Sequence, residues 1–402
     1  MNQQVSEGAS SLRTFYADLH IHIGRTNRGE AVKISGSRDL TFFNIAKEAA
    51  TRKGIELIGI IDAHAPVVQR DIREALESGE MREISGGGIA YQNTVILLGT
   101  ELEVREPGRK ESHFLAYFRT LSDMESFTAW ITPLMKNVNL SSQRVYVPLK
   151  ELQKDIVGRG GLFIPAHVFT PHKGIYGSSV YRMEEILDVA DVTAIELGLS
   201  ADSEMAGYIS ELDHMAFLTN SDAHSLGKIG REYNSLRLLE PSFDELCYAL
   251  QNKDGRRIEA NYGLNPLLGK YHRTYCAACN SILDESKVTG ERCPYCGSTK
   301  LIQGVLDRIL TIADREESYI PPGRPAYQYQ VPLEFIPGLG KVKLRLLLEA
   351  FGSEMAILHR TEEAELRSVV GDELARYIIM ARSGELLLNS GGGGTYGKVS
   401  RT

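Results

Sequence analysis

The stretch Asp18-Leu19-His20-Ile21-His22 places three metal-binding side chains within five residues, at the end of an apolar run. Because residues two apart in a β-strand point to the same face, Asp18, His20 and His22 would project together, with Leu19 and Ile21 on the opposite face. Imidazole suits zinc, iron and manganese, and a carboxylate can bridge two such ions. The stretch therefore predicts a strand that holds metal, although a surface strand with two chance histidines is the simpler explanation of an isolated His-x-His.

The alternation of strand and helix patterns continues from Phe15 to Leu239. Short apolar runs alternate with segments whose apolar residues recur at helical spacing, such as residues 40–54, which end in a glycine. The runs read FYADLHIHI, LIGIIDAH, TVILLGTELEV, HFLAYF, LFIPAHV, VTAIELGL and AFLTNSDAH. Such alternation predicts βα units that assemble into a parallel sheet or barrel.

Nearly every run carries a side chain that can bind a metal at one end. In a β/α barrel the chemistry gathers where the strands end. One histidine at such a place is usually a hydrogen-bonded core or loop residue, but six histidines with at least three carboxylates indicate a shared metal centre. Beyond the first run these residues are Asp62, His64, Glu101, His113, His167, Glu196, Asp222 and His224.

The motifs DLHIH, IDAH, PAHV and NSDAH, with the Glu101 strand and His113, resemble the successive motifs of the PHP (polymerase and histidinol phosphatase) superfamily. The resemblance implies a distorted seven-stranded β/α barrel that hydrolyses phosphoesters with two or three divalent metals (zinc, manganese or magnesium) at its strand ends. The implied metal ligands are His20, His22, His64, Glu101, His113, His167, Asp222 and His224. The implied catalytic residues are Asp18, Asp62, His167 and Asp222, of which Asp18 and Asp62 would orient neighbouring histidines.

The sequence departs from the PHP pattern just after the first motif. Many PHP enzymes carry a further histidine a few residues downstream, where this chain reads Gly24-Arg25-Thr26-Asn27-Arg28. One metal position is therefore filled differently or weakly, and the number of ions stays open between two and three.

The loop at residues 169–179 follows His167 and is rich in glycine, aromatic and hydrogen-bonding residues. Loops on this face of a barrel carry specificity, and aromatic rings there could stack on a flat heterocycle. A mobile lid without base-reading function explains the same composition. The candidate substrate contacts in this loop are Phe169, Lys173, Tyr176, Ser178 and Ser179.

Two cysteine pairs follow the predicted barrel. Cys276-Ala-Ala-Cys279 and Cys293-Pro-Tyr-Cys296 are separated by thirteen residues. Four thiolates close a tetrahedral zinc site and leave no position for water, so the pattern predicts a zinc ribbon with one structural zinc rather than a redox or catalytic site. It also suits a reducing compartment better than disulfides would. Lys270 and Arg273, just before the first pair, are candidate phosphate contacts.

The C-terminal part begins with a stiff linker at residues 320–325, IPPGRP. The segment FIPGLGK, with Gly338, Gly340 and Lys341, precedes an apolar helical pattern and is similar to a helix-hairpin-helix motif. In that motif the glycines let the backbone approach a DNA phosphate, and the lysine adds charge. A plain turn between helices is the alternative for this motif. A second, weaker copy surrounds Gly371. The glycine-rich composition of residues 391–402 predicts disorder.

The composition indicates a soluble protein of several domains. The chain has 402 residues, 43% hydrophobic and 24% charged, with a formal net charge of -7. That charge argues against a wholesale basic coat for nucleic acid but leaves room for a local basic face. The sequence has neither a signal peptide pattern nor an apolar run long enough for a bilayer, so we expect no membrane association and a cytoplasmic location. The expected domains are a PHP barrel (1–260), a four-cysteine zinc module (261–320) and a linker, helix-hairpin-helix region and tail (321–402).

The order of barrel, four-cysteine ribbon and helix-hairpin-helix region resembles the endonuclease Q family over most of residues 12–385. The resemblance implies a DNA repair endonuclease that uses a metal-activated water to nick duplex DNA 5′ of deaminated bases (hypoxanthine, uracil) and abasic sites, with the damaged nucleotide flipped out. A DNA replication clamp is a candidate partner. A PHP phosphatase acting on a small phosphorylated metabolite and a non-catalytic DNA-binding scaffold remain alternatives.

Overall fold

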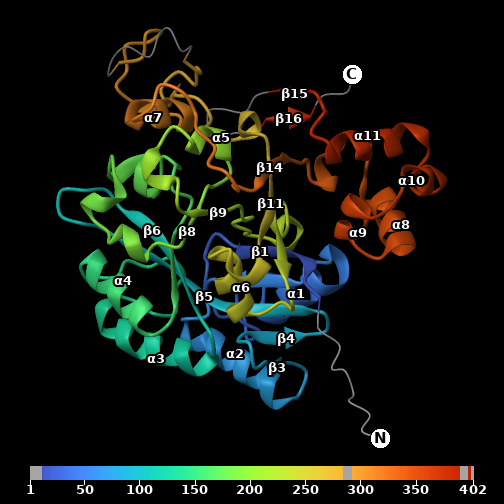
Figure 1. The fold of residues 1–402 in the computed structure, drawn as a ribbon, viewed down its shortest axis with the longest axis horizontal. Helices are drawn as coiled ribbons and strands as arrows, with labels where there is room; N and C mark the ends of the chain where they lie inside the picture. Colours follow the sequence, from blue (N-terminus) through green and yellow to red (C-terminus); the bar gives the residue numbers. More distant parts are fainter. Residues whose placement is uncertain (1–10, 284–291, 390–396, 400–402) are drawn as a thin grey trace, which may run out of the picture.

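The computed structural model describes residues 11–283, 292–389 and 397–399 (Figure 1). Each of the seven apolar runs forms a strand of the central barrel, as the sequence predicts. The strands are β1 (Arg13–Ile21), β2 (Leu57–Ile60), β5 (Thr94–Val104), β6 (Ser112–Phe118), β7 (Leu162–Pro165), β8 (Ala194–Glu196) and β9 (Ala216–Leu218). β8 and β9 form a separate two-stranded sheet with β8 next to β7, so the barrel is distorted, and the predicted fold class is confirmed.

The strands are not all parallel, and in this respect the sequence-based expectation is wrong. β1, β2 and β5 are parallel neighbours, as are β8 and β9, but β6 runs antiparallel to both β5 and β7. The reason is the short connection between β5 and β6, which permits a hairpin but no crossover helix. His113 at the start of β6 consequently pairs with Glu103 near the end of β5 and reaches the same face of the barrel as the other strand ends.

Further strands widen the sheet on both sides. β10 (Tyr233–Leu238) pairs antiparallel with β1, β11 (Arg257–Gly263) follows it, and β14 (Ala326–Tyr329) adds parallel to β11. β4 (Ile89–Tyr91) and β3 (Arg82–Glu83) extend the edge beyond β5. Because β14 directly follows the predicted linker, the chain beyond residue 321 takes part in the same sheet as the barrel.

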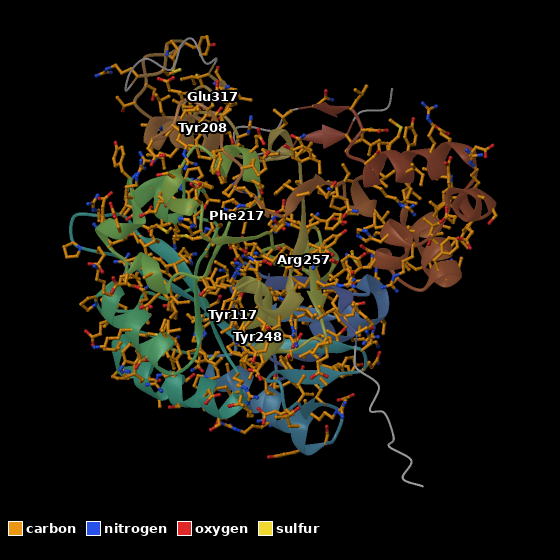
Figure 2. All side chains as sticks on the ribbon, in the orientation of Figure 1. Tyr117, Tyr208, Phe217, Tyr248, Arg257 and Glu317 are labelled. Carbon is orange, nitrogen blue, oxygen red and sulfur yellow. The ribbon has the colours of Figure 1, made fainter. Side chains whose placement is uncertain are left out.

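Helices cover the outside of the strands, and alternate strand residues fill the inside. One apolar cluster draws residues such as Leu19, Leu97 and Ile164 from all seven barrel strands and is closed by α6, whereas their neighbours along the strands pack outward against the helices. Tyr117 belongs to this interior cluster, whereas Phe217, on β9, belongs to the outer one (Figure 2). The helices of this part are α1 (Phe42–Lys47), α2 (Pro66–Glu77), α3 (Leu121–Ile131), α4 (Leu149–Gly158), α5 (Ser203–Ala206) and α6 (Phe243–Leu250).

The helix predicted at residues 40–54 is present. Thr41 caps α1 by accepting a hydrogen bond from the backbone N–H of Asn44. α1 continues as a π-helical segment, Glu48–Lys53, and ends at Gly54 in the left-handed conformation. None of the helices in the described ranges is both long and apolar enough to cross a lipid bilayer.

The zinc module contains β12 (Tyr275–Cys276), β13 (Leu301–Ile302) and α7 (Val305–Ile312). The helical C-terminal region comprises α8 (Lys341–Phe351), α9 (Glu354–His359), α10 (Glu363–Val370) and α11 (Asp372–Arg382), grouped at one side of the barrel (Figure 1). Most of the predicted disordered tail lies outside the described residues, but β16 (Lys398–Val399) pairs with β15 (Leu388–Asn389).

Buried polar contacts join the helical region to the barrel. The His359 ring of α9 stacks on Tyr16 with 4.5 Å between ring centroids, and its Nε2 lies 2.6 Å from the Tyr233 hydroxyl. Beside it, Lys53 Nζ donates to Glu354 Oε2 (2.9 Å) and to the Gly227 carbonyl (3.0 Å). The helical region is therefore fixed against the sheet rather than held by a linker alone.

Candidate metal centre

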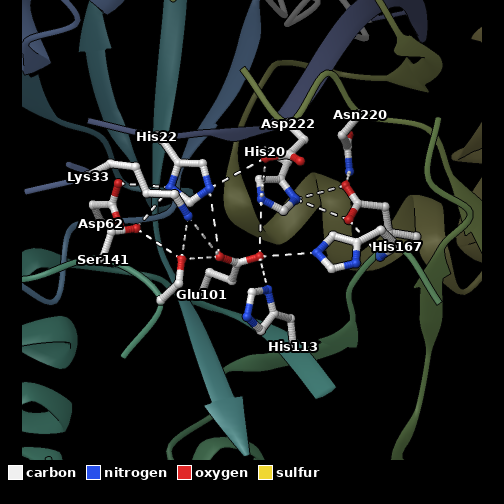
Figure 3. A network of polar contacts seen from close by, with 12 residues as sticks. His20, His22, Lys33, Asp62, Glu101, His113, Ser141, His167, Asn220 and Asp222 are labelled. Carbon is white, nitrogen blue, oxygen red and sulfur yellow. Dashed lines mark hydrogen bonds and ion pairs between the residues drawn. The ribbon is translucent and has the colours of Figure 1, made fainter. Parts of the chain in front are cut away.

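Side chains from the ends of β1 and β5, the start of β6 and the segments after β7 and β9 converge at one end of the barrel (Figure 3). In the described part of the chain they form three overlapping groups whose ligand atoms lie within 4.8 Å of one another. Glu101 belongs to two groups and His22 to two, so the groups make one continuous centre. The groups are His20 with His22 and Glu101, His22 with Asp222 and His224, and Glu101 with His113 and His167.

A register shift in β1 aims its ligands into this centre. The pairing of β1 with β2 changes register between Asp18 and Ile21. There the Leu19 carbonyl accepts a hydrogen bond from the Tyr117 hydroxyl, and it lies so close to Gly59 that a Cβ at position 59 would meet it at 2.2 Å. Glycine at 59 therefore permits the bulge, and such bulges re-aim side chains beside active sites. The bulge breaks the strict period of two that the sequence suggests.

The imidazole rings are oriented as metal ligands usually are, with one nitrogen held by the protein and the other directed inward. The Nδ1 atoms of His20, His22 and His64 lie 3.0, 3.1 and 2.8 Å from Glu196, Asp62 and Thr100 respectively. Among the described residues, Nε2 of His20, His22, His64 and His113 is buried and lacks a hydrogen-bond partner. Buried orphan acceptors beside carboxylates fit divalent metal ions, which would complete their coordination.

The charges of the centre are tightly coupled. Burial opposes ionisation of Asp62, but its contact with His22 outweighs this and lowers the pKa of the carboxyl to about 2. Burial favours a neutral His20, yet the Glu196 carboxylate raises the imidazole pKa to about 10. Glu101 likewise has a pKa well below its ordinary value despite burial, because of its contacts with His113 and Lys33. The carboxylates are thus anionic because positive charge surrounds them, and a divalent ion bound by the imidazole nitrogens would supply that charge in place of the imidazole protons.

Asp18 has a different role from the one the PHP resemblance implies. Its buried carboxylate accepts hydrogen bonds from the backbone N–H groups of Ser221 (3.0 Å) and Gly230 (2.8 Å). It therefore holds the loop that carries Asp222 and His224 instead of orienting an imidazole. Burial raises the pKa of Asp18. Asp222 has a φ of 45° and His167 one of 30°, strained values that cluster at functional sites.

Glu196 is the orienting group that the sequence analysis noted at a strand end but assigned no role. Besides holding His20, it accepts hydrogen bonds from the His167 backbone N–H (2.9 Å) and the Asn220 side chain (3.0 Å). Its position at the end of β8 was the feature of the sequence from which a role at the centre could have been predicted. His64, in contrast, lies outside the three groups, although its orphan Nε2 leaves it a candidate ligand.

A cleft of about 640 Å³ opens over the metal centre. Its walls include residues of the centre, such as His22 and Asp222, and the polar segment after β7, at Thr170 and His172. Five basic side chains also line it, on a chain whose net charge is negative. They are Lys33, Lys173, Lys228, Arg231 and Lys270. The net charge of the whole chain does not show this local basic surface, which lies in the cleft over the metal centre.

The loop at residues 169–179 contributes less to the cleft than the sequence suggests. Phe169 and Tyr176 are 1% and 0% exposed, stack on each other, and the Tyr176 hydroxyl donates to Glu211. Because neither ring offers a free face, the described conformation does not support stacking on a base. Ser178 donates to the Gly174 carbonyl (3.2 Å), and Ser179 is outside the cleft lining. Lys173 does line the cleft, with its Nζ 2.6 Å from Glu103.

The four cysteines lie together as the zinc prediction requires. Sγ atoms of Cys276 and Cys296 are 3.6 Å apart, and those of Cys279 and Cys293 are 3.7 Å apart. A tetrahedron of sulfurs 2.3 Å from zinc has edges of about 3.8 Å. The four thiol groups therefore fit one zinc ion. Arg273, predicted to contact phosphate, pairs with Asp307 of α7 at 3.1 Å and so has a role within this module.

The hairpin before α8 has the backbone expected for a close approach. Gly338 has a φ of 84°, and Gly340 is the N-cap of α8, with open space where its Cβ would stand. Lys341 is exposed at the first position of that helix. Gly371, with a φ of 84°, joins α10 to α11 in the predicted second copy. Both hairpins present a helix N-terminus at the surface.

Comparisons with known proteins place this arrangement in a family. No family model matches the chain. It is 50% identical over 391 residues to the uncharacterized protein YqxK of Bacillus subtilis (strain 168), covering 96% of this chain and 100% of that one. The crystal structure of the lesion-specific endonuclease PfuEndoQ from Pyrococcus furiosus matches with a TM-score of 0.84 and 30% identity over 96% of this chain and 95% of that one. Endonuclease Q in complex with a 27-mer duplex bearing an abasic lesion at the active site matches with a TM-score of 0.83 and 30% identity, over 97% of each chain. The chain therefore belongs to the endonuclease Q family.

Proposed function

We propose that this protein is a metal-dependent DNA repair endonuclease that hydrolyses the phosphodiester 5′ of a deaminated base (hypoxanthine or uracil) or of an abasic site. The observation that carries the proposal is the cluster of buried, unpartnered imidazole nitrogens at the base of a cleft lined with basic side chains. The full-length match to a solved endonuclease Q bound to an abasic duplex supports the choice of DNA as the substrate.

The proposed chemistry needs no protein nucleophile. Divalent ions, when bound, supply Lewis acidity toward water and the scissile phosphate. Glu196, Asp62 and Thr100 hold the imidazole rings so that their free nitrogens face the centre, and Asp18 holds the loop of Asp222 and His224 in place. The proposed ligands are His20, His22, His64, Glu101, His113, His167, Asp222 and His224.

The cleft suits a nucleotide taken out of the duplex. A duplex cannot bring an intact, paired base to a buried centre, whereas an extruded nucleotide fits a cleft of about 640 Å³. A damaged or missing base costs less free energy to unpair than an intact one, which favours lesions. Lys173, Lys228 and Lys270 at the wall would neutralise the phosphates that flank the extruded position.

The two appended regions would hold the duplex outside the cleft. One structural zinc at the four cysteines would stabilise a module too small for a core of its own. The hairpin with Gly338, Gly340 and Lys341 would bind the DNA backbone without reading base sequence. A replication clamp is not part of this proposal, since no feature in the described ranges supports one.

Nicking assays test the proposal directly. Labelled duplexes that carry one hypoxanthine, one uracil, one abasic site or no lesion are incubated with the protein and Mn²⁺, Mg²⁺ or Zn²⁺. We expect a single nick 5′ of each lesion, its loss in Asp222→Asn, and its retention in Glu77→Gln, which changes an exposed residue of α2. Hydrolysis of a generic phosphomonoester without any lesion-dependent nick would support the metabolite phosphatase instead. Retention of DNA with neither activity would support a scaffold.

A further inference from the structure

The loop between β1 and α1 places one lysine beside the metal centre. The backbone N–H of Lys33 donates to the carbonyl of Ile23 (2.9 Å), and that of Val32 donates to Gly24 (3.0 Å). Val32 is buried, and a Cβ at Gly24 would meet the Ser37 carbonyl at 1.9 Å, so the two arms of the loop touch at a glycine. The loop is therefore folded back on the end of β1, and Lys33 is anchored next to His22.

The side chain of Lys33 extends into the cleft. Its Nζ donates to Ser142 Oγ (2.7 Å) and lies 3.6 Å from Glu101 Oε2, while Ser142 also donates to Glu101. The side chain is 16% exposed and lines the cleft, as do His22 and His224. Figure 3 shows it beside His22 and Glu101. An ammonium group held among ligands of the centre faces whatever group those ligands bind.

Neutralising Glu101 accounts for only part of this placement. The other oxygen of Glu101 already lies 2.8 Å from His113 Nδ1 and 3.2 Å from His167 Nε2. The 3.6 Å from Lys33 to Glu101 is longer than a hydrogen bond. An ammonium carries three N–H donors, and among the described residues only Ser142 accepts one at hydrogen-bond distance. At least one N–H donor of this mostly buried group is thus directed at the cleft, where a partner would offset the cost of burial.

We propose that Lys33 is a catalytic residue that binds a non-bridging oxygen of the scissile phosphate through its ammonium group. The proposal rests on the proposed function and adds a protein-derived cation to the metal centre. Lys33 keeps its protons throughout, so the reaction remains the addition of one water across one P–O bond. The hydrogen bond that Lys33 donates strengthens as negative charge develops on the phosphate oxygens in the transition state. It therefore lowers the activation free energy of hydrolysis.

The test compares Lys33→Met and Lys33→Arg with Lys47→Met, which removes one exposed charge from neighbouring α1. Metal content is measured by mass spectrometry, and the affinity of the Mn²⁺-loaded protein for inorganic phosphate by calorimetry. Because a hydrogen bond to a charged group is lost, we expect Lys33→Met to bind phosphate about ten- to a hundredfold more weakly with unchanged metal content. Lys33→Arg should recover part of this loss, and Lys47→Met should behave as the unaltered protein.

Single-turnover cleavage of an abasic duplex provides the second measurement. We expect Lys33→Met to lower the rate of the chemical step about a hundred- to a thousandfold, as loss of one transition-state donor does elsewhere. Unchanged phosphate affinity and rate, or loss of metal or of thermal stability, would overturn the assignment. If phosphate binding falls in Lys33→Met but the unaltered protein never cuts lesion DNA, the proposed function fails while the phosphate contact of Lys33 stands.

Discussion

Removing the charge of Glu354 should loosen the helical region from the barrel. Lys53 and Glu354 are 4% and 7% exposed, and their charged atoms are 2.9 Å apart. In Glu354→Gln the Lys53 ammonium stays buried without a counter-charge of its own, which costs about 3–5 kcal/mol. That cost falls on the interface between α9 and the π-helical segment Glu48–Lys53. We therefore expect the helical region to open more readily than in the unaltered protein.

Native-state hydrogen exchange measures this opening. Peptides from residues 341–382 should exchange more than a hundredfold faster in Glu354→Gln, since 1.4 kcal/mol corresponds to a factor of ten. The double variant Lys53→Met with Glu354→Leu should recover much of the loss, because it leaves no buried charge. Glu349→Gln is the matched control: its pair with Arg345 is more than 60% exposed, so the effect should stay below about 1 kcal/mol. Equal exchange in Glu354→Gln and the control would refute the reasoning.

Four further predictions concern the centre, one buried carboxyl group of the barrel and the two appended regions. Glu196→Gln should weaken Mn²⁺ binding about 10- to 100-fold in calorimetry, because the carboxylate no longer holds His20; an unchanged affinity would contradict this. Burial raises the pKa of Glu232 well above its ordinary value, so the folded state keeps a proton that the unfolded state releases. The stability that this group contributes is present below about pH 4.5 and is lost as the pH rises, so Glu232→Gln should gain stability relative to the unaltered protein at pH 8 but not at pH 4.5 in urea denaturation. Cys296→Ser should lower the zinc content by one ion and speed proteolysis within residues 270–312, and an intact zinc content would show that the thiolate is not a ligand. Lys341→Ala should weaken duplex binding equally for all sequences and reduce the dependence of log K on log salt by about 1, as measured by fluorescence anisotropy; an unchanged slope would mean that the lysine does not touch phosphate.

The strands and the metal-competent side chains at their ends could be predicted because both signals are local. An apolar run that ends in His or a carboxylate can be recognised within a few residues of sequence, as in β1 and β5. The direction of β6 could not be predicted in the same way. Helical connections elsewhere in the barrel favour parallel strands, and this pattern was extended to β6. The hairpin that joins β5 to β6 is short, and its length was the clue.

Roles that depend on distant partners could not be predicted. Glu196 orients His20 across the barrel, and nothing near either residue in the sequence connects them. Lys33 reaches the centre only because its loop folds back through backbone hydrogen bonds. Tyr176 is of a residue type that often contacts substrates. Its hydroxyl instead donates a hydrogen bond to Glu211, far along the chain, and its ring is buried in the core.

The placement of the zinc module between β11 and β14 has a consequence for how the protein matures. Residues 264–325 separate these two parallel strands along the chain, and the four cysteines are among them. Closing so long a connection costs chain entropy. A metal ion bound by the four cysteines would lower that cost slightly, because it shortens the flexible chain between the two strands. Until β14 pairs with it, β11 would be an open sheet edge, which is prone to pair with other chains. A zinc ion held by the four cysteines would then favour the pairing of β14 with β11, and so the covering of this edge.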